Sequence, residues 1–100
     1  MRLVVRPAAE ADIRAAALWY ESRSPGLGGE FLRAIDVAFA EIERAPGRFP
    51  VVHLQCRRAL IRRFPYGVYF VHAGDVVTVV ACIHARRDPQ RWQERAEGDR

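Results

Sequence analysis

Val76-Val77-Thr78-Val79-Val80-Ala81-Cys82-Ile83-His84 is rich in β-branched residues, which favour extended structure. Side chains of a strand alternate between its two faces. Alternation places Val76, Val80 and Cys82 on one face and Val77, Val79, Ala81 and Ile83 on the other. A strand that is apolar on both faces is normally central in its sheet. The segment therefore predicts a buried central strand, around which the rest of the chain is arranged.

The residues before this segment predict further strands in an antiparallel meander. Ala73-Gly74-Asp75 is typical of a tight hairpin turn. One strand is predicted at Gly67 to His72, and another from Arg57 to Phe64, where Pro65 ends it. Val51 to Leu54 predicts a short edge strand or an irregular entry into the sheet.

The first half of the chain predicts one strand followed by two helices. Arg2 to Arg6 is short and β-branched, and Pro7 suits the first position of a helix that continues to Ser22. Ser24 is a candidate N-cap for a second helix, which ends at Ala45-Pro46-Gly47. Because the link between them is short, the two helices should form an antiparallel hairpin.

The end of the chain predicts a third, short helix. Asp88 and Pro89 read as its N-cap and first residue, and it should continue to Arg95, with residues 96–100 frayed. The expected order is β-α-α-β-β-β-α in a single domain spanning residues 1–100. Helices grouped apart from strands indicate an α+β fold, with the helical hairpin packed on a twisted antiparallel sheet.

The charge distribution points to an anionic partner. The formal net charge is +4, and all 16 basic residues are arginines. A genomic preference for arginine explains the absence of lysine, but it does not decide where the arginines cluster. The second half carries Arg57, Arg58, Arg62, Arg63, Arg86, Arg87, Arg91 and Arg95, whereas acidic residues dominate Glu10 to Glu43. Such a basic half indicates binding to acidic protein or to nucleic acid.

Other features narrow the class of protein. No segment has the 18 or so apolar residues needed to cross a bilayer, and the apolar stretch within residues 1–7 is too short for a signal peptide. Cys56 and Cys82 form no metal-binding pattern with histidine. We therefore expect a cytoplasmic protein with no membrane association, no metal and no cofactor.

Several segments, in this order, resemble the RelE/ParE family of toxins. In the helical half they are Ala11-Asp12-Ile13, Trp19-Tyr20-Glu21, Gly26-Leu27-Gly28 and Phe31-Leu32. The strand half supplies Arg57 to Phe70, and the end supplies His84-Ala85-Arg86-Arg87-Asp88-Pro89 with Trp92 and Arg95. The resemblance implies the toxin of a type II toxin–antitoxin module, neutralised in a hetero-oligomer by a small cognate antitoxin. It implies one of two targets: RelE-like members cut messenger RNA on the ribosome, and ParE-like members poison DNA gyrase.

The chain departs from the RelE-like pattern in ways that favour the ParE-like alternative. RelE-like nucleases carry lysines along the strand face and a tyrosine near the C-terminus. This sequence has no lysine, and Trp92 is the only aromatic residue after His84. A third alternative is a degenerate, non-toxic member that only binds an antitoxin.

If the chain were RelE-like, three residues would be the candidates for catalysis. Arg62 and Arg86 would hold the phosphate, and His84 would transfer protons as acid or base. The alternative for His84 is a hydrogen bond to the backbone or to Asp88.

Six further residues are candidates for binding a partner protein or nucleic acid: Arg57, Arg58, Arg63, Arg87, Trp92 and Arg95. Arginine presents a planar, permanently charged group that suits carboxylate and phosphate. Alternatively, Arg57 and Arg58 are a solvated edge, and Trp92 anchors the last helix on the sheet.

Overall fold

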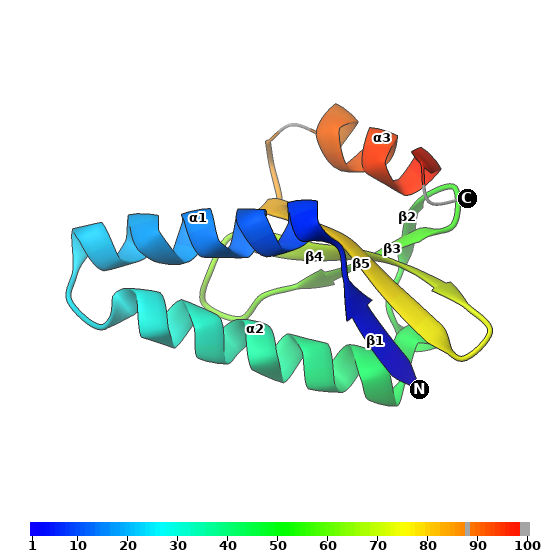
Figure 1. The fold of residues 1–100 in the computed structure, drawn as a ribbon, viewed down its shortest axis with the longest axis horizontal. Coiled ribbons are helices and arrows are strands. Elements are labelled where there is room, and N and C mark those ends of the chain that lie inside the picture. Colours follow the sequence, from blue (N-terminus) through cyan, green and yellow to red (C-terminus); the bar gives the residue numbers. More distant parts are fainter. Residues whose placement is uncertain (88, 99–100) are drawn as a thin grey trace.

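The computed structural model describes residues 1–87 and 89–98. Its elements, in order, are β1 (Arg2–Val5), α1 (Pro7–Arg23), α2 (Leu27–Arg44), the 3-10 helix η1 (Pro46–Arg48), β2 (Val51–His53), β3 (Cys56–Leu60), β4 (Tyr66–Ala73), β5 (Val76–His84) and α3 (Pro89–Gly98). Figure 1 shows the sheet between the α1–α2 hairpin and α3. The predicted α+β class and the helical hairpin are confirmed.

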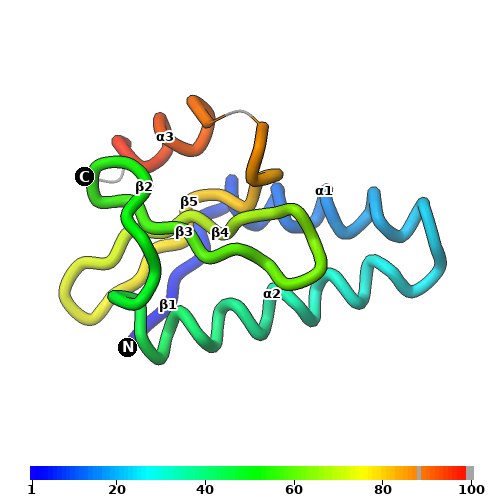
Figure 2. The backbone as a smooth tube through the Cα atoms, turned by 180° about the vertical axis from the view of Figure 1, so that it is seen from behind, coloured from blue at the N-terminus to red at the C-terminus, as the bar shows by residue number. Residues whose placement is uncertain are grey.

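The sheet has the strand order β1-β5-β4-β3-β2. β2 to β5 pair antiparallel, as the sequence predicts, and β5 has a neighbour on each side. β1 pairs parallel with β5, from Arg2↔Val76 to Val5↔Val79, so the sheet is mixed and not wholly antiparallel. The helical hairpin carries the chain from β1 at one edge of the sheet to β2 at the other, and the antiparallel strands then return to β5 beside β1. Figures 1 and 2 place the N-terminus beside the C-terminal end of α2.

A β-bulge in β5 changes which face its side chains occupy. Tyr69 pairs with Ala81, but the next residue, Phe70, pairs with Val79, so Val80 is inserted into the ladder. The bulge interrupts the alternation. Cys82 consequently packs in the core beneath the helical hairpin with Val79, whereas Ala81 packs on the α3 side. The face assignment predicted from strict alternation is therefore wrong beyond the bulge.

Each face of the sheet has its own apolar cluster. The larger one lies beneath the hairpin, where Phe31, Ile35 and Ile42 of α2 are at most 2% exposed. On the other face Trp92 of α3 stacks on Tyr69, with ring centroids 4.5 Å apart and planes at 16°. Trp92 thus anchors α3 to the sheet.

β3 ends at Leu60 and not at Phe64 as predicted. Residues 61–65 form a turn in which Arg63 takes the left-handed conformation, with φ of 72°. Ile61 and Phe64 remain buried, and the Ile61 amide donates to the Tyr66 carbonyl at 2.9 Å. These two apolar residues are therefore buried although they lie outside a strand, and for this reason the apolar pattern predicts a strand that is too long.

Two helix boundaries also differ from the predictions. Ser24 does not cap α2; its amide donates to the Tyr20 carbonyl at 3.1 Å and so ends α1, while Gly26, with φ of 89°, precedes α2. α3 continues past Arg95 to Gly98, and Ala96 is only 3% exposed, so residues 96–98 are helical and not frayed. The predicted Asp88 cap and the last two residues lie outside the described part.

Candidate functional site

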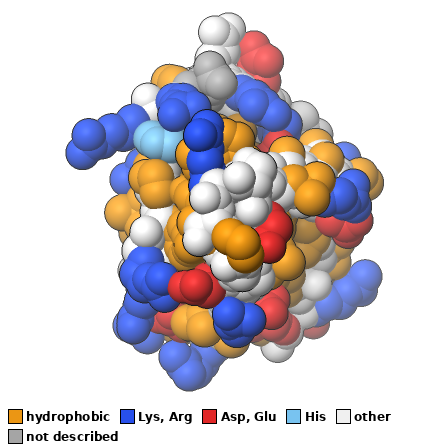
Figure 3. All heavy atoms as spheres, turned by 90° about the vertical axis from the view of Figure 1, so that its left-hand side faces the viewer, with side chains coloured by type: hydrophobic (Ala, Val, Ile, Leu, Met, Phe, Trp, Pro, Cys, Tyr) orange, Lys and Arg blue, Asp and Glu red, His pale blue; other side chains and the backbone are white. Residues whose placement is uncertain are grey.

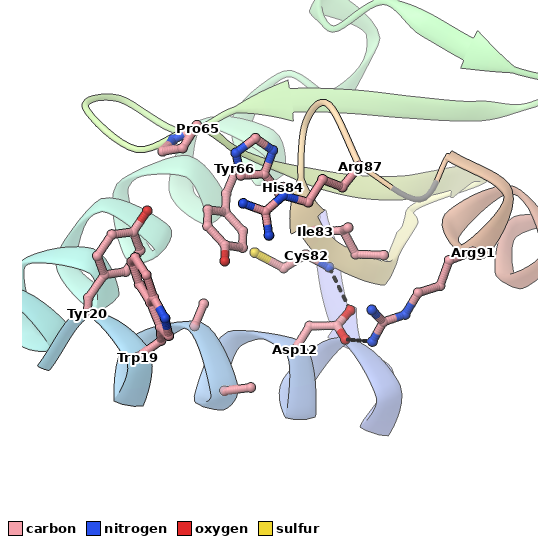
Figure 4. Close-up of a pocket in the computed structure, with 12 residues that line it drawn as sticks. Asp12, Trp19, Tyr20, Pro65, Tyr66, Cys82, Ile83, His84, Arg87 and Arg91 are labelled. Carbon is pink, nitrogen blue, oxygen red and sulfur yellow. Dashed lines mark hydrogen bonds and ion pairs between the residues drawn. The ribbon is translucent and has the colours of Figure 1, made fainter. Parts of the chain in front are cut away.

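A cavity of about 430 Å³ lies between α1 and the ends of β4 and β5 (Figure 4). Its lining residues are Asp12, Ala15, Ala16, Trp19, Tyr20, Pro65, Tyr66, Cys82, Ile83, His84, Arg87 and Arg91. α1 contributes residues from successive turns, which share a helix face. β5 contributes Cys82, Ile83 and His84, which follow the bulge, and β4 contributes its first residue, Tyr66. The cavity thus joins residues of the first helix with residues of the second half of the sequence.

Asp12 holds α1, the bulge and α3 together. Its carboxylate is 6% exposed and accepts the amide of Cys82 at 3.0 Å. Arg95 pairs with it at 2.5 Å and also donates to the carbonyl of Val80 at 3.3 Å. Arg91 adds a contact of 3.2 Å. Charge-assisted hydrogen bonds to one buried carboxylate are among the stronger polar interactions in proteins.

The hydroxyl groups of Tyr20 and Tyr66 are held neutral in the cavity wall. Burial raises the pKa of each; Tyr66 further raises the pKa of Tyr20, and Cys82 and Asp12 further raise that of Tyr66. The guanidinium of Arg87 acts in the opposite direction and lowers both pKa values, although burial outweighs it. Near neutral pH both groups are therefore hydrogen-bond donors.

His84 lines the cavity at the end of β5. Its ring lies 5.7 Å from that of Tyr66. The Arg86 amide donates to His84 Nδ1 at 3.2 Å, so this nitrogen is an acceptor. In a neutral imidazole the proton then resides on Nε2. His84 therefore makes the backbone hydrogen bond that the sequence analysis named as the alternative to catalysis, and it also lines the cavity.

Among residues 1–87 and 89–98, Arg87 has no carboxylate partner, whereas Arg91, the other arginine that lines the cavity, pairs with Asp12. Figure 4 shows the Arg87 guanidinium beside the rings of His84 and Tyr66. From the sequence, Arg87 is predicted only as a partner-binding residue, and nothing beyond the family resemblance indicates a role for Asp12. Arg91 and Arg95 are four residues apart on a predicted helix, so their side chains share one face and can both reach the same carboxylate.

The three residues proposed for nuclease chemistry are not gathered in one hollow. His84 lines the cavity, whereas Arg62 lines a separate groove of about 330 Å³ between α2 and β3. Arg86 is exposed and lines neither of these two hollows.

Most of the partner-binding candidates have contacts within the chain. Arg57 donates to the carbonyl of Phe49 at 2.6 Å, and Arg63 pairs with Glu30 at 2.6 Å across the groove. The stem of Arg58 passes over Gly67, where a Cβ would lie 3.1 Å from its Cγ and Cδ atoms. Trp92 and Arg95 hold α3, as described above.

The end of the molecule nearest the α1–α2 turn has an uneven surface. Figure 3 shows basic side chains around a histidine in the upper part of this face, next to hydrophobic side chains. Acidic and basic groups mix in its lower part. Trp19 of the cavity rim is half exposed.

Two general features complete the description. None of the helices in the described part is long and apolar enough to cross a membrane. Within the same residues, no group of three or more His, Cys, Asp or Glu side chains is arranged to hold a metal ion.

Comparison with known proteins identifies the family. A solved structure described as the chromosomal ParDE TA system from P. aeruginosa matches with a TM-score of 0.62 and 17% sequence identity, over 84% of this chain and 95% of that chain. This likeness shows a shared fold. No curated protein matches the sequence. The family model for the ParE toxin of the type II toxin–antitoxin system parDE matches residues 3–89. The chain therefore belongs to the ParE toxin family of type II toxin–antitoxin systems.

Proposed function

We propose that the chain is a growth-inhibiting toxin that acts in the cytoplasm on DNA gyrase and is neutralised by a cognate antitoxin. The observation that carries the proposal is the ParE family match over residues 3–89. In this proposal the protein is a binding inhibitor and carries out no reaction of its own.

The positions of the candidate nuclease residues support a binding inhibitor. Cleavage of RNA through its 2′-hydroxyl needs a base, an acid and a cation around one phosphate. Arg62 and His84 line different hollows, and Arg86 lines neither. Neither of these two hollows therefore brings all three residues to one phosphate group.

One observation favours a second candidate function, a ribosome-dependent endoribonuclease. His84 Nε2, Arg87 and the Tyr66 hydroxyl share the cavity, which brings a proton-transfer group near a cation. Here Arg87, and not Arg62 or Arg86, would hold the phosphate. This candidate requires the His84 ring for activity, whereas gyrase inhibition does not.

The antitoxin is the partner that the charge distribution fits. With a net charge of +4, the chain attracts an acidic segment, and its arginines offer charge-assisted contacts. Such a complex would be a toxin–antitoxin hetero-oligomer.

Purified protein can separate the two candidate functions. The full chain should inhibit supercoiling by purified gyrase and leave ribosome-bound message intact. His84→Gln should inhibit gyrase as the wild type does. Intact supercoiling together with message cleavage that His84→Gln abolishes would replace this proposal with the nuclease.

A further inference from the structure

We propose that the cavity between α1 and the ends of β4 and β5 binds one carboxylate of an acidic side chain on the antitoxin, with Arg87 as its counter-ion. This inference rests on the proposed function for the identity of the partner. The binding site itself rests on the geometry of this chain.

The carboxylate already present in the cavity is fully engaged. Asp12 Oδ1 accepts from Arg91 and Arg95, and Oδ2 accepts from Arg95 and from the amide of Cys82. Asp12 is also the only carboxylate among the described residues that line the cavity. Arg87 is therefore left with a guanidinium that an external anion can pair.

The remaining polar side chains of the cavity can each donate a hydrogen bond. The hydroxyls of Tyr20 and Tyr66 are neutral, and His84 carries its proton on Nε2. Burial raises the pKa of Cys82 to about 12, so its thiol adds no negative charge. Donors that surround an unpaired cation select an anion over a neutral or cationic ligand.

Charge and shape favour a side-chain carboxylate over other anions. A planar carboxylate can accept two parallel hydrogen bonds from the guanidinium fork. Trp19, Pro65 and Ile83 supply apolar surface for the aliphatic stem that carries it. A volume of about 430 Å³ accommodates the stem as well as the charged group.

Titration with propionate, the side-chain analogue of glutamate, tests the site on the full chain. NMR signals of the Arg87 guanidinium and the His84 ring should shift in a saturable way. Propionamide has the same shape without the charge and should leave these signals in place. The control variant Arg48→Gln removes the same charge from an exposed position in η1 and should bind propionate like the wild type.

Two variants report on the proposed contacts. Arg87→Gln should weaken propionate binding about tenfold or more, the loss expected for one charge-assisted contact. Tyr66→Phe removes only a hydroxyl and should weaken binding about threefold, within the range of a neutral hydrogen bond. Tyr66→Phe keeps the aromatic ring, so it still tests the site if Arg87→Gln changes the conformation of the segment between β5 and α3.

Three outcomes would overturn the inference: no saturable shift with propionate, equal shifts with propionamide, or unchanged binding in both variants. Tighter binding of dimethyl phosphate than of propionate would also overturn it and assign the cavity to a phosphodiester. None of these results depends on gyrase or on growth. Failure of the cavity proposal is therefore distinguishable from failure of the proposed function.

Discussion

At the scale of single residues, Asp12 joins three distant parts of the chain through one carboxylate. One carboxylate satisfies the backbone amide that follows the bulge and two arginines of α3. Because the group is 6% exposed, solvent screens it poorly, and loss of its charge leaves Arg95 without its counter-ion. The residue therefore matters for stability before it matters for function.

Asp12→Asn should lower the free energy of unfolding by about 3 kcal/mol, the lower end for one partner of a buried pair, since Arg95 is partly exposed. Urea unfolding of the variant and the wild type measures this. Glu10→Gln is the matched control, because Glu10 pairs with Arg14 on the exposed side of the same helix, and such pairs contribute at most about 0.5 kcal/mol. Equal losses in the two variants would contradict this role of Asp12.

The buried thiols predict a loss of stability at alkaline pH. Burial raises the pKa of Cys82 from its ordinary 9.0 to about 12 and that of Cys56 to about 11. The unfolded chain ionises first, so this stabilisation is complete below pH 9.0 and is lost as pH rises toward the folded pKa values. Each thiol should contribute a slope of about 1.4 kcal/mol per pH unit in this window.

Urea unfolding at several pH values tests this prediction with Cys82→Ala. The free energy of unfolding of the variant should fall less steeply above pH 9.0, by the contribution of one thiol. Loss of the packed sulfur atom lowers the free energy of unfolding equally at every pH, so it does not change the slope of that free energy against pH. Parallel pH curves for the variant and the wild type would mean that Cys82 ionises as readily in the folded state.

At the scale of elements, the helical hairpin depends on a close approach near its turn. A Cβ added at Gly28 would lie 2.6 Å from the carbonyl oxygen of Ala17, so α1 and α2 touch there through backbone. The Glu21 carboxylate accepts the amides of Gly26 and Gly28, at 2.9 Å and 3.0 Å, and so caps α2 in place of the predicted Ser24.

Gly28→Ala should therefore cost about 2 kcal/mol, because the helices must separate to admit the methyl group. Gly29→Ala is the matched control, since its Cβ would meet only Arg33 Nη1, at 3.5 Å. The control should change stability by zero to about 0.8 kcal/mol in the favourable direction, from helix propensity. Thermal unfolding of both variants distinguishes the cases, and equal stability of the two would refute the close contact.

How far the sequence predicts these elements depends on the interaction that fixes each one. Apolar periodicity locates the helices and the central strand because burial produces that periodicity directly. Apolar periodicity does not reveal the bulge at Val80, because the bulge depends on how β5 pairs with β4, a different segment of the sequence. The Asp12 junction is hidden for the same reason: its partners Arg91 and Arg95 lie some 80 positions away in the sequence.

At the scale of the molecule, the two faces of the sheet are covered differently. The hairpin covers one face with two long helices, whereas the described part of α3 buries only Trp92 and Ala96 on the other. The candidate cavity lies between α1 and the ends of β4 and β5, and residues after β5 complete its wall. The fold thus leaves a basic, donor-rich hollow for a partner, as the proposed binding role needs.

The proposed function can be tested most directly by inducible expression of the chain in a bacterial host, with DNA and protein synthesis measured separately. A gyrase inhibitor should stop DNA synthesis first and induce filamentation and the SOS response, and His84→Gln should do the same. Protein synthesis that stops first, and recovers in His84→Gln, would contradict the account and assign the cavity to ribonuclease chemistry. Normal growth with the protein present would contradict its toxicity altogether.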